Sequence, residues 1–112
     1  MSYKHKKGVQ AKLLAHHWLL EKGYQVLQED TGQYPVDLVG IHLESGRIRC
    51  FEVKTMAMRS NGTMIHRILT EKQKELEIRM QKYIEIIYVD LENIGGTYIA
   101  RKNFLLPKRS IK

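Results

Sequence analysis

The spacing of hydrophobic residues changes several times along this chain, and each change predicts where a helix or a strand begins or ends. Residues 8–22 carry apolar side chains at intervals of three and four, which is the spacing of one face of an α-helix. The apolar stripe of this helix consists of Ala11, Leu14, Ala15 and Trp18. Residues 70–82 predict a second helix, because Thr70 and Glu71 are typical of a helix N-terminus.

Strands are predicted where apolar and polar residues alternate, or where short apolar runs lie between turn residues. These strands cover residues 24–28, 36–42, 47–55, 83–91 and 97–100. Ser45 and Gly46 are typical of a hairpin turn between the second and third strands. The fourth strand carries apolar residues on both faces, which favours burial on both sides. The predicted order, α-β-β-β-α-β-β, indicates an α/β fold.

Length and charge favour one small domain with a polyanionic partner. The 112 residues leave room for a single domain, 1–112, with a modest core. Nineteen Lys and Arg against twelve Asp and Glu give a net charge of +7, which favours binding to nucleic acid. We expect a basic arm at residues 1–7 and a loose basic tail at residues 101–112.

Several classes of protein are disfavoured. No apolar run approaches the roughly 20 residues of a spanning helix, so we expect no membrane segment and a cytoplasmic protein associated with a nucleoid, a virus or a mobile element. The single cysteine, Cys50, excludes an internal disulfide and a cysteine-rich zinc site. We expect it to pack within a strand.

Charged residues are concentrated at two points of the predicted hairpin. Asp37 lies at the start of one strand, and Glu52 and Lys54 lie two positions apart on the next. Since side chains alternate along a strand, Glu52 and Lys54 share a face. A register that sets Asp37 opposite Glu52 would bring two carboxylates and an ammonium group together. Separately, these residues are typical of a turn and of a solvated edge strand; together they favour a site.

Such a site suits a divalent cation beside a phosphate. Mg²⁺ prefers oxygen ligands and keeps several waters, so Asp37, Glu52 and the backbone carbonyl of Val53 are the candidate metal ligands. The ion would polarise a phosphate and activate a water. Lys54 would orient that water and offset the charge that develops on the phosphate. Asp37, Glu52 and Lys54 are therefore the candidate catalytic residues.

The segments Pro35-Val36-Asp37 and Phe51-Glu52-Val53-Lys54 resemble the motif of the PD-(D/E)XK nuclease superfamily. The opening segment, residues 7–12, is similar to that of the archaeal-type Holliday-junction resolvases. This resemblance implies a restriction-endonuclease-like core, with a mixed central sheet flanked by helices. It also implies a homodimeric, Mg²⁺-dependent endonuclease that cuts branched DNA and in which Mn²⁺ can substitute. Lys12 departs from the family pattern, which has a glutamate at that position.

Further residues are weaker candidates. We expect contacts with DNA from basic residues near the site, with ordinary solvated charges as the competing interpretation; these residues are Lys6, Lys7, Lys12, Arg59 and Arg67. Gln10 and Gln73 are possible auxiliary residues. His16 shares the helical face of Lys12 and is a weaker candidate for a phosphate contact or an auxiliary base.

Three hypotheses remain open. The leading one is a junction-cutting endonuclease, whose dimer interface would lie near Ile94, Tyr98 or Phe104. The second is a nuclease that acts on other DNA structures. The third is a catalytically degenerate DNA-binding module, for which Lys12 is the main argument. The intact set of Asp37, Glu52 and Lys54 argues against this last hypothesis, because two carboxylates would repel a polyanion.

Overall fold

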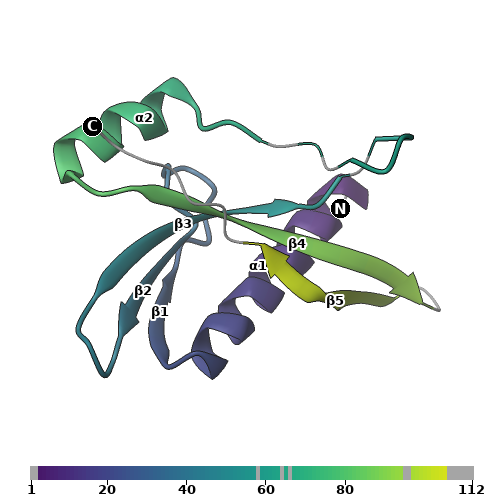
Figure 1. Ribbon diagram of the computed structural model, residues 1–112, viewed down its shortest axis with the longest axis horizontal. Helices are drawn as coiled ribbons and strands as arrows, with labels where there is room; N and C mark the ends of the chain where they lie inside the picture. Colours follow the sequence, from purple (N-terminus) through teal and green to yellow (C-terminus); the bar gives the residue numbers. More distant parts are fainter. Residues whose placement is uncertain (1–2, 58, 64, 66, 95–96, 106–112) are drawn as a thin grey trace.

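The computed structural model describes residues 3–57, 59–63, 65, 67–94 and 97–105. Within these residues, two helices and five strands follow one another in the predicted order (Figure 1). The elements are α1 (Tyr3–Glu21), β1 (Tyr24–Gln28), β2 (Leu38–His42), β3 (Ile48–Thr55), α2 (Glu71–Met80), β4 (Ile84–Ile94) and β5 (Thr97–Leu105). The α/β fold and its element order are therefore confirmed.

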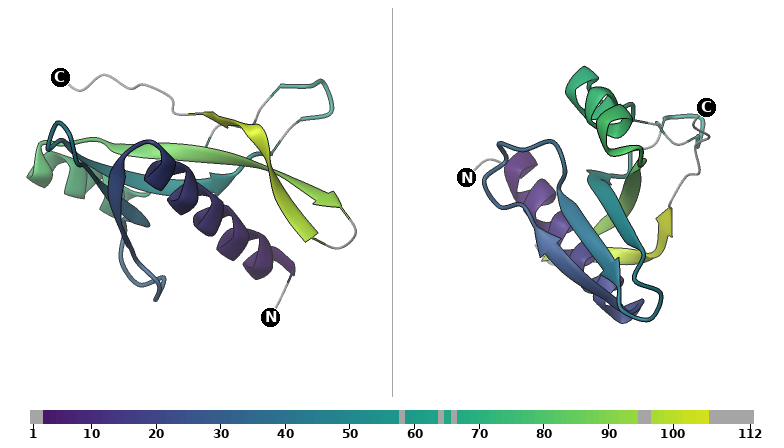
Figure 2. Two further views of the ribbon diagram at one scale, coloured as in Figure 1. Left: turned by 90° about the horizontal axis from the view of Figure 1, so that it is seen from below. Right: turned by 90° about the vertical axis from the view of Figure 1, so that its left-hand side faces the viewer.

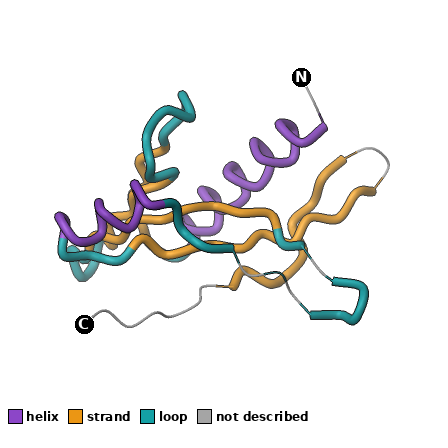
Figure 3. Tube along the Cα trace, turned by 90° about the horizontal axis from the view of Figure 1, so that it is seen from above, coloured by secondary structure: helices purple, strands orange, loops and turns teal. Residues whose placement is uncertain are grey.

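The five strands form one mixed sheet in the order β1-β2-β3-β4-β5. All neighbouring pairs are antiparallel except β3 and β4, which run parallel. A parallel pair needs a crossover connection, and here the connection contains α2. The helices α1 and α2 lie on opposite faces of the sheet (Figures 2 and 3). This architecture is compatible with a restriction-endonuclease-like core.

Each face of the sheet has its own hydrophobic core. The cluster on the α1 side comprises Ala11, Ala15, Leu19, Leu38, Phe51, Ile87 and Val89. The cluster on the α2 side comprises Cys50, Leu69, Ile84, Ile86 and Tyr88. Because β4 contributes buried residues to both clusters, its predicted burial on two faces is confirmed. The predicted packing of Cys50 within a strand is confirmed as well.

Two boundaries differ from the sequence-based expectation. Helix α1 begins at Tyr3, so residues 3–7 of the expected arm belong to the helix, since neither proline nor glycine interrupts the chain before Gly8. Strand β5 continues to Leu105, which pairs with Tyr88, so residues 101–105 of the expected tail belong to the sheet. Backbone pairing with β4 overrides the basic composition that suggested a tail. Residues 106–112 lie outside the described part of the chain.

None of the helices within the described residues has the length and apolar character that a membrane crossing requires.

Candidate active site

Asp37 lies just before the start of β2 and is fixed there by the backbone of β3. In the β2–β3 ladder Leu38 pairs with Phe51, which places Asp37 beside Glu52, as predicted. The Asp37 N–H donates a hydrogen bond of 3.0 Å to the Phe51 carbonyl. Oδ2 of the Asp37 carboxylate accepts a hydrogen bond of 2.8 Å from the Val53 N–H. Phe51 therefore fixes the backbone of Asp37, and Val53 fixes its carboxylate.

Glu52 is buried on the α2 side of the sheet, with only 9% of its surface exposed. Its Oε2 accepts a hydrogen bond from Nε2 of Gln73, and its Oε1 lies 3.7 Å from Nζ of Lys54. Phe51 belongs to the core on the opposite side, so the predicted alternation of faces is confirmed. Strand geometry thus brings the three candidate catalytic residues together.

Gln73 connects α2 to this site. Its side-chain Nε2 also donates a hydrogen bond of 2.7 Å to the Pro35 carbonyl, and its Oε1 accepts one of 2.9 Å from the Thr70 N–H. Thr70 caps the helix and completes a capping box with Gln73. Gln73, a possible auxiliary residue in the sequence analysis, is buried, with an exposed fraction of 5%. The capping pattern was the signal that could have indicated this inward orientation.

The electrostatics of the site are dominated by two crowded carboxyl groups. Burial and, after it, the neighbouring Asp37 carboxyl raise the pKa of Glu52 to about 7, although Lys54 and Gln73 oppose the rise. Desolvation and a like charge both disfavour the ionised form of a carboxyl group. A cation between Asp37 and Glu52 would relieve this cost. The pair therefore has the charge distribution that a divalent ion would complement.

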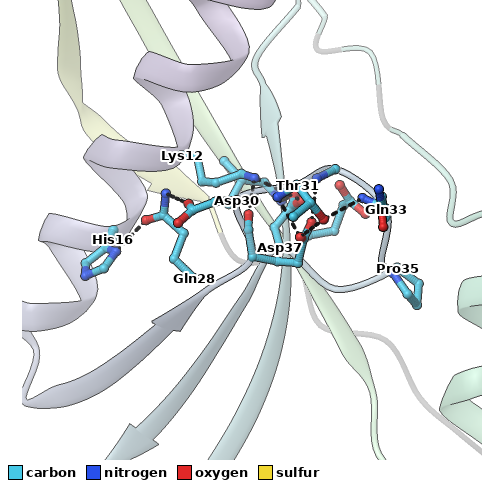
Figure 4. Close-up of polar contacts among 12 residues, drawn as sticks. Lys12, His16, Gln28, Asp30, Thr31, Gln33, Pro35 and Asp37 are labelled. Carbon is cyan, nitrogen blue, oxygen red and sulfur yellow. Dashed lines mark hydrogen bonds and ion pairs between the residues drawn. The ribbon is translucent and has the colours of Figure 1, made fainter.

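Lys12 extends from α1 toward Asp37 (Figure 4). Its Nζ donates a hydrogen bond of 2.7 Å to the Glu29 carbonyl and lies 3.8 Å from Oδ1 of Asp37. The side chain is only 20% exposed. Sequence analysis gave Lys12 as a departure from the family pattern and as a candidate contact for DNA. The structure places its ammonium group within ion-pair distance of a site carboxylate.

The loop between β1 and β2 is tied down beside Asp37. The Glu29 carboxylate accepts hydrogen bonds from the N–H groups of Thr31 at 2.7 Å and Gly32 at 2.8 Å, and from the Thr31 hydroxyl. The side-chain bond from Thr31 is the main cause that lowers the pKa of Glu29. The Glu29 N–H donates to the Asp37 carbonyl at 2.9 Å. Sequence analysis missed this arrangement.

A hydrogen-bonded chain extends from α1 along the edge of the site. Nδ1 of His16 lies 2.6 Å from Oε1 of Gln28, and Nε2 of Gln28 donates to Oδ1 of Asp30 at 3.0 Å (Figure 4). His16 thus contacts Gln28. The suggested role of His16 as a phosphate contact or a base stays a prediction.

The remaining candidates lie at the margins. Lys7 and Gln10 are half-buried on α1, and the side chain of Lys6 lies outside the described ones. Arg59 and Arg67 are exposed on the loop between β3 and α2. The Arg67 N–H donates a hydrogen bond of 2.7 Å to the buried Tyr88 hydroxyl, which anchors this loop to β4.

The donor set fits a hard divalent ion with many water ligands. Among the described residues, no group of three or more His, Cys, Asp and Glu side chains could hold a metal. Asp37 and Glu52 would supply two carboxylates to such an ion, and water would supply most of the remaining ligands. The Val53 N–H points to Asp37. In a strand, the N–H and C=O of one residue point to the same side, so the Val53 carbonyl also faces the Asp37 side of β3. Two carboxylates and a carbonyl suit Mg²⁺ better than zinc.

Comparison with known proteins gives one partial likeness. No family model and no solved structure matches the chain. The chain is similar to a UPF0102 protein of Chlorobium phaeobacteroides (strain BS1), with 33% identity over 72 residues. The matched stretch covers 64% of this chain and 57% of that protein. The chain thus spans little more than half of the length of this curated relative.

Proposed function

We propose that this protein is a metal-dependent endodeoxyribonuclease that hydrolyses phosphodiester bonds in branched DNA, in the manner of a Holliday-junction resolvase. One observation carries the proposal. Asp37 and Glu52 converge where β2 begins, and Lys54 lies 3.7 Å from Glu52 on the same face. A buried glutamate with a second carboxylate and a lysine beside it suits metal-assisted hydrolysis of phosphate esters.

In the proposed mechanism, Asp37, Glu52 and the Val53 carbonyl would hold Mg²⁺, for which Mn²⁺ can substitute. The bound ion supplies Lewis-acid activation of the phosphate and of the attacking water. Gln73 keeps the Glu52 carboxylate turned toward Asp37, because it is itself fixed by Pro35 and the helix cap. The Lys54 side chain is 41% exposed, so its ammonium group can orient the water and offset charge on the phosphate.

The basic character of the chain supports DNA as the substrate. The net charge is +7, and the proposed phosphate contacts are Lys6, Lys7, Lys12, Arg59 and Arg67. Two symmetric cuts at a four-way junction need two sites, which a twofold-symmetric homodimer would provide. The side chains of Ile94, Tyr98 and Phe104, proposed for the interface, lie outside the described ones. As part of this proposal, the protein would act inside a cell, on a nucleoid, a viral genome or a mobile element.

Two alternatives have specific support. The metal site itself is indifferent to DNA shape, so a nuclease for other DNA structures would use the same residues. A degenerate DNA-binding module is favoured by Lys12, whose ammonium group lies 3.8 Å from Asp37. Against that module, a protein that only bound DNA would gain little from a buried Glu52 beside Asp37, because both groups repel phosphate.

A substrate panel tests this proposal. Purified protein is incubated with a labelled four-way junction, a linear duplex of the same sequence and a single strand, in Mg²⁺ and in chelator. Asp37→Asn, purified in parallel, controls for contaminating nucleases. Paired Mg²⁺-dependent nicks on the junction alone are expected. Cutting of the other substrates would assign a different nuclease, and binding without cutting would establish the module.

A further inference from the structure

We infer that the ammonium group of Lys12 is a built-in cation of the active site, so that each site takes one divalent ion and excludes a second. This inference rests on the proposed function, because it concerns the same metal site. It assigns to Lys12 an electrostatic role that goes beyond a contact with DNA. Three observations support it. The Glu29 carbonyl holds Lys12 in place, the two oxygens of Asp37 have different partners, and the nearby acids accept hydrogen bonds within their own loop.

Lys12 is held in place independently of Asp37. Its Nζ donates a hydrogen bond of 2.7 Å to the Glu29 carbonyl, whereas its distance to Asp37 is 3.8 Å, which is too long for a direct hydrogen bond. The Glu29 backbone is in turn fixed, since its N–H bonds to the Asp37 carbonyl at 2.9 Å. The ammonium group is therefore positioned by backbone and would stay beside the site when Asp37 takes another partner.

The two oxygens of Asp37 have different partners. Oδ2 accepts the hydrogen bond from the Val53 N–H at 2.8 Å, and Oδ1 is the oxygen that faces Lys12. An ion bound through Oδ1 would therefore compete for this oxygen with the positive charge of the Lys12 ammonium group. A second dication on the Lys12 side of Asp37 would meet that positive charge directly, at a distance where like charges repel strongly.

The nearby acids Glu29 and Asp30 do not supply the additional carboxylate that a second ion would need. The Glu29 carboxylate is turned into its own loop, where it accepts hydrogen bonds from Thr31 and Gly32. The Asp30 carboxylate accepts a hydrogen bond from Gln28 at 3.0 Å. Both acids thus have their own partners within the loop that follows β1.

Each of the two site carboxylates has one ammonium group nearby. Asp37 faces Lys12, and Glu52 faces Lys54, so two carboxylates meet two ammonium groups. One divalent ion makes the site positive, which suits an incoming phosphate. The Lys12 side chain is 20% exposed, so its positive charge can also attract that phosphate. The fixed ammonium group thereby does part of the work that a second ion would otherwise do.

Titration with Mn²⁺ in the absence of DNA tests this inference without relying on activity. Isothermal calorimetry and the loss of the free-ion electron paramagnetic resonance signal give the number of bound ions and their affinity. We expect one ion per chain for the wild type, and none at this site for Asp37→Asn. For Lys12→Glu we expect a second ion. Lys22→Glu, an equal charge reversal just after α1 at an exposed position, should remain at one ion.

Lys12→Gln covers the case in which Lys12→Glu does not fold. It removes the charge without adding a ligand, and we expect it to bind one ion about tenfold more tightly because a nearby positive charge no longer repels the ion. Unchanged affinity in Lys12→Gln, or one ion of unchanged affinity in Lys12→Glu, would overturn the inference and leave the proposed function intact. Two ions in the wild type would also overturn it. No bound ion in the wild type would instead count against the proposed function.

Discussion

The backbone N–H of Val53 donates a hydrogen bond of 2.8 Å to the carboxylate of Asp37. The position of this acid therefore depends on the register of two strands. A slip of one residue would turn Glu52 toward the α1 side and Phe51 out of its core. The apolar contacts of Phe51 and Leu38 thus stabilise the same register that assembles the site.

Gln73→Ala tests the connection between α2 and the site. The substitution leaves Glu52 without a buried hydrogen-bond donor and removes the contact with the Pro35 carbonyl. We expect a loss of about 1–3 kcal/mol in the free energy of unfolding, measured with urea. We also expect Mn²⁺ affinity to fall about 10-fold or more, because the ligand Glu52 loses its orientation.

Thr70→Ala is the matched control for Gln73. It removes the side chain that caps α2 and leaves the Gln73 contact with Glu52. Its cost should be about 1 kcal/mol, with little effect on metal affinity. If both variants change Mn²⁺ affinity equally, Gln73 acts only through the helix.

Glu52→Gln tests the electrostatic cost of burying Glu52 beside Asp37. Burial and the neighbouring Asp37 raise the pKa of Glu52 to about 7 from its ordinary 4.5. Between these two pH values the folded protein therefore keeps a proton on Glu52 that the unfolded protein has lost. The wild type should therefore lose stability relative to Glu52→Gln as pH rises through this window, by on the order of 3 kcal/mol in total. Urea denaturation at a series of pH values, without metal, measures this difference. Parallel stability curves for the two proteins would show that Glu52 titrates normally.

Lys54→Met separates catalysis from metal binding. Lys54 is proposed to act on the water and the phosphate, so its loss should lower the cleavage rate about 10²–10³-fold. Mn²⁺ affinity should be unchanged or higher, because a positive charge 3.7 Å from Glu52 is removed. Lys72→Met, an exposed change of the same charge on α2, should leave the rate unchanged. Equal rates in Lys54→Met and the wild type would remove Lys54 from the mechanism.

Much of the fold could be predicted because its signals are local. The bounds of β1 and the capping of α2 by Thr70 follow from residues adjacent in sequence. The convergence of Asp37 and Glu52 was predictable because both lie on one hairpin, where the turn sets the register. The longer β5 was missed because backbone pairing with β4 leaves no composition signal.

The partners that come from distant elements could not be predicted. Lys12 and Glu29 are 17 positions apart, and their contact depends on how α1 packs on the sheet. Gln73 reaches Pro35 across 38 positions, by way of the crossover that contains α2. No periodicity within either segment encodes such contacts. They follow from tertiary packing, which also decides which face of each helix is buried.

The central claim is that Asp37 and Glu52 form a catalytic metal centre, and single-turnover cleavage of a labelled four-way junction tests it most directly. In Mg²⁺, Asp37→Asn and Glu52→Gln should cut at least about 10²–10³-fold more slowly than the wild type. Their DNA affinity, measured in chelator, should be equal or higher because a negative charge is lost. Glu44→Gln, at an exposed position beside the hairpin turn, serves as the control. Mg²⁺-dependent cleavage at the wild-type rate by Asp37→Asn would contradict the account.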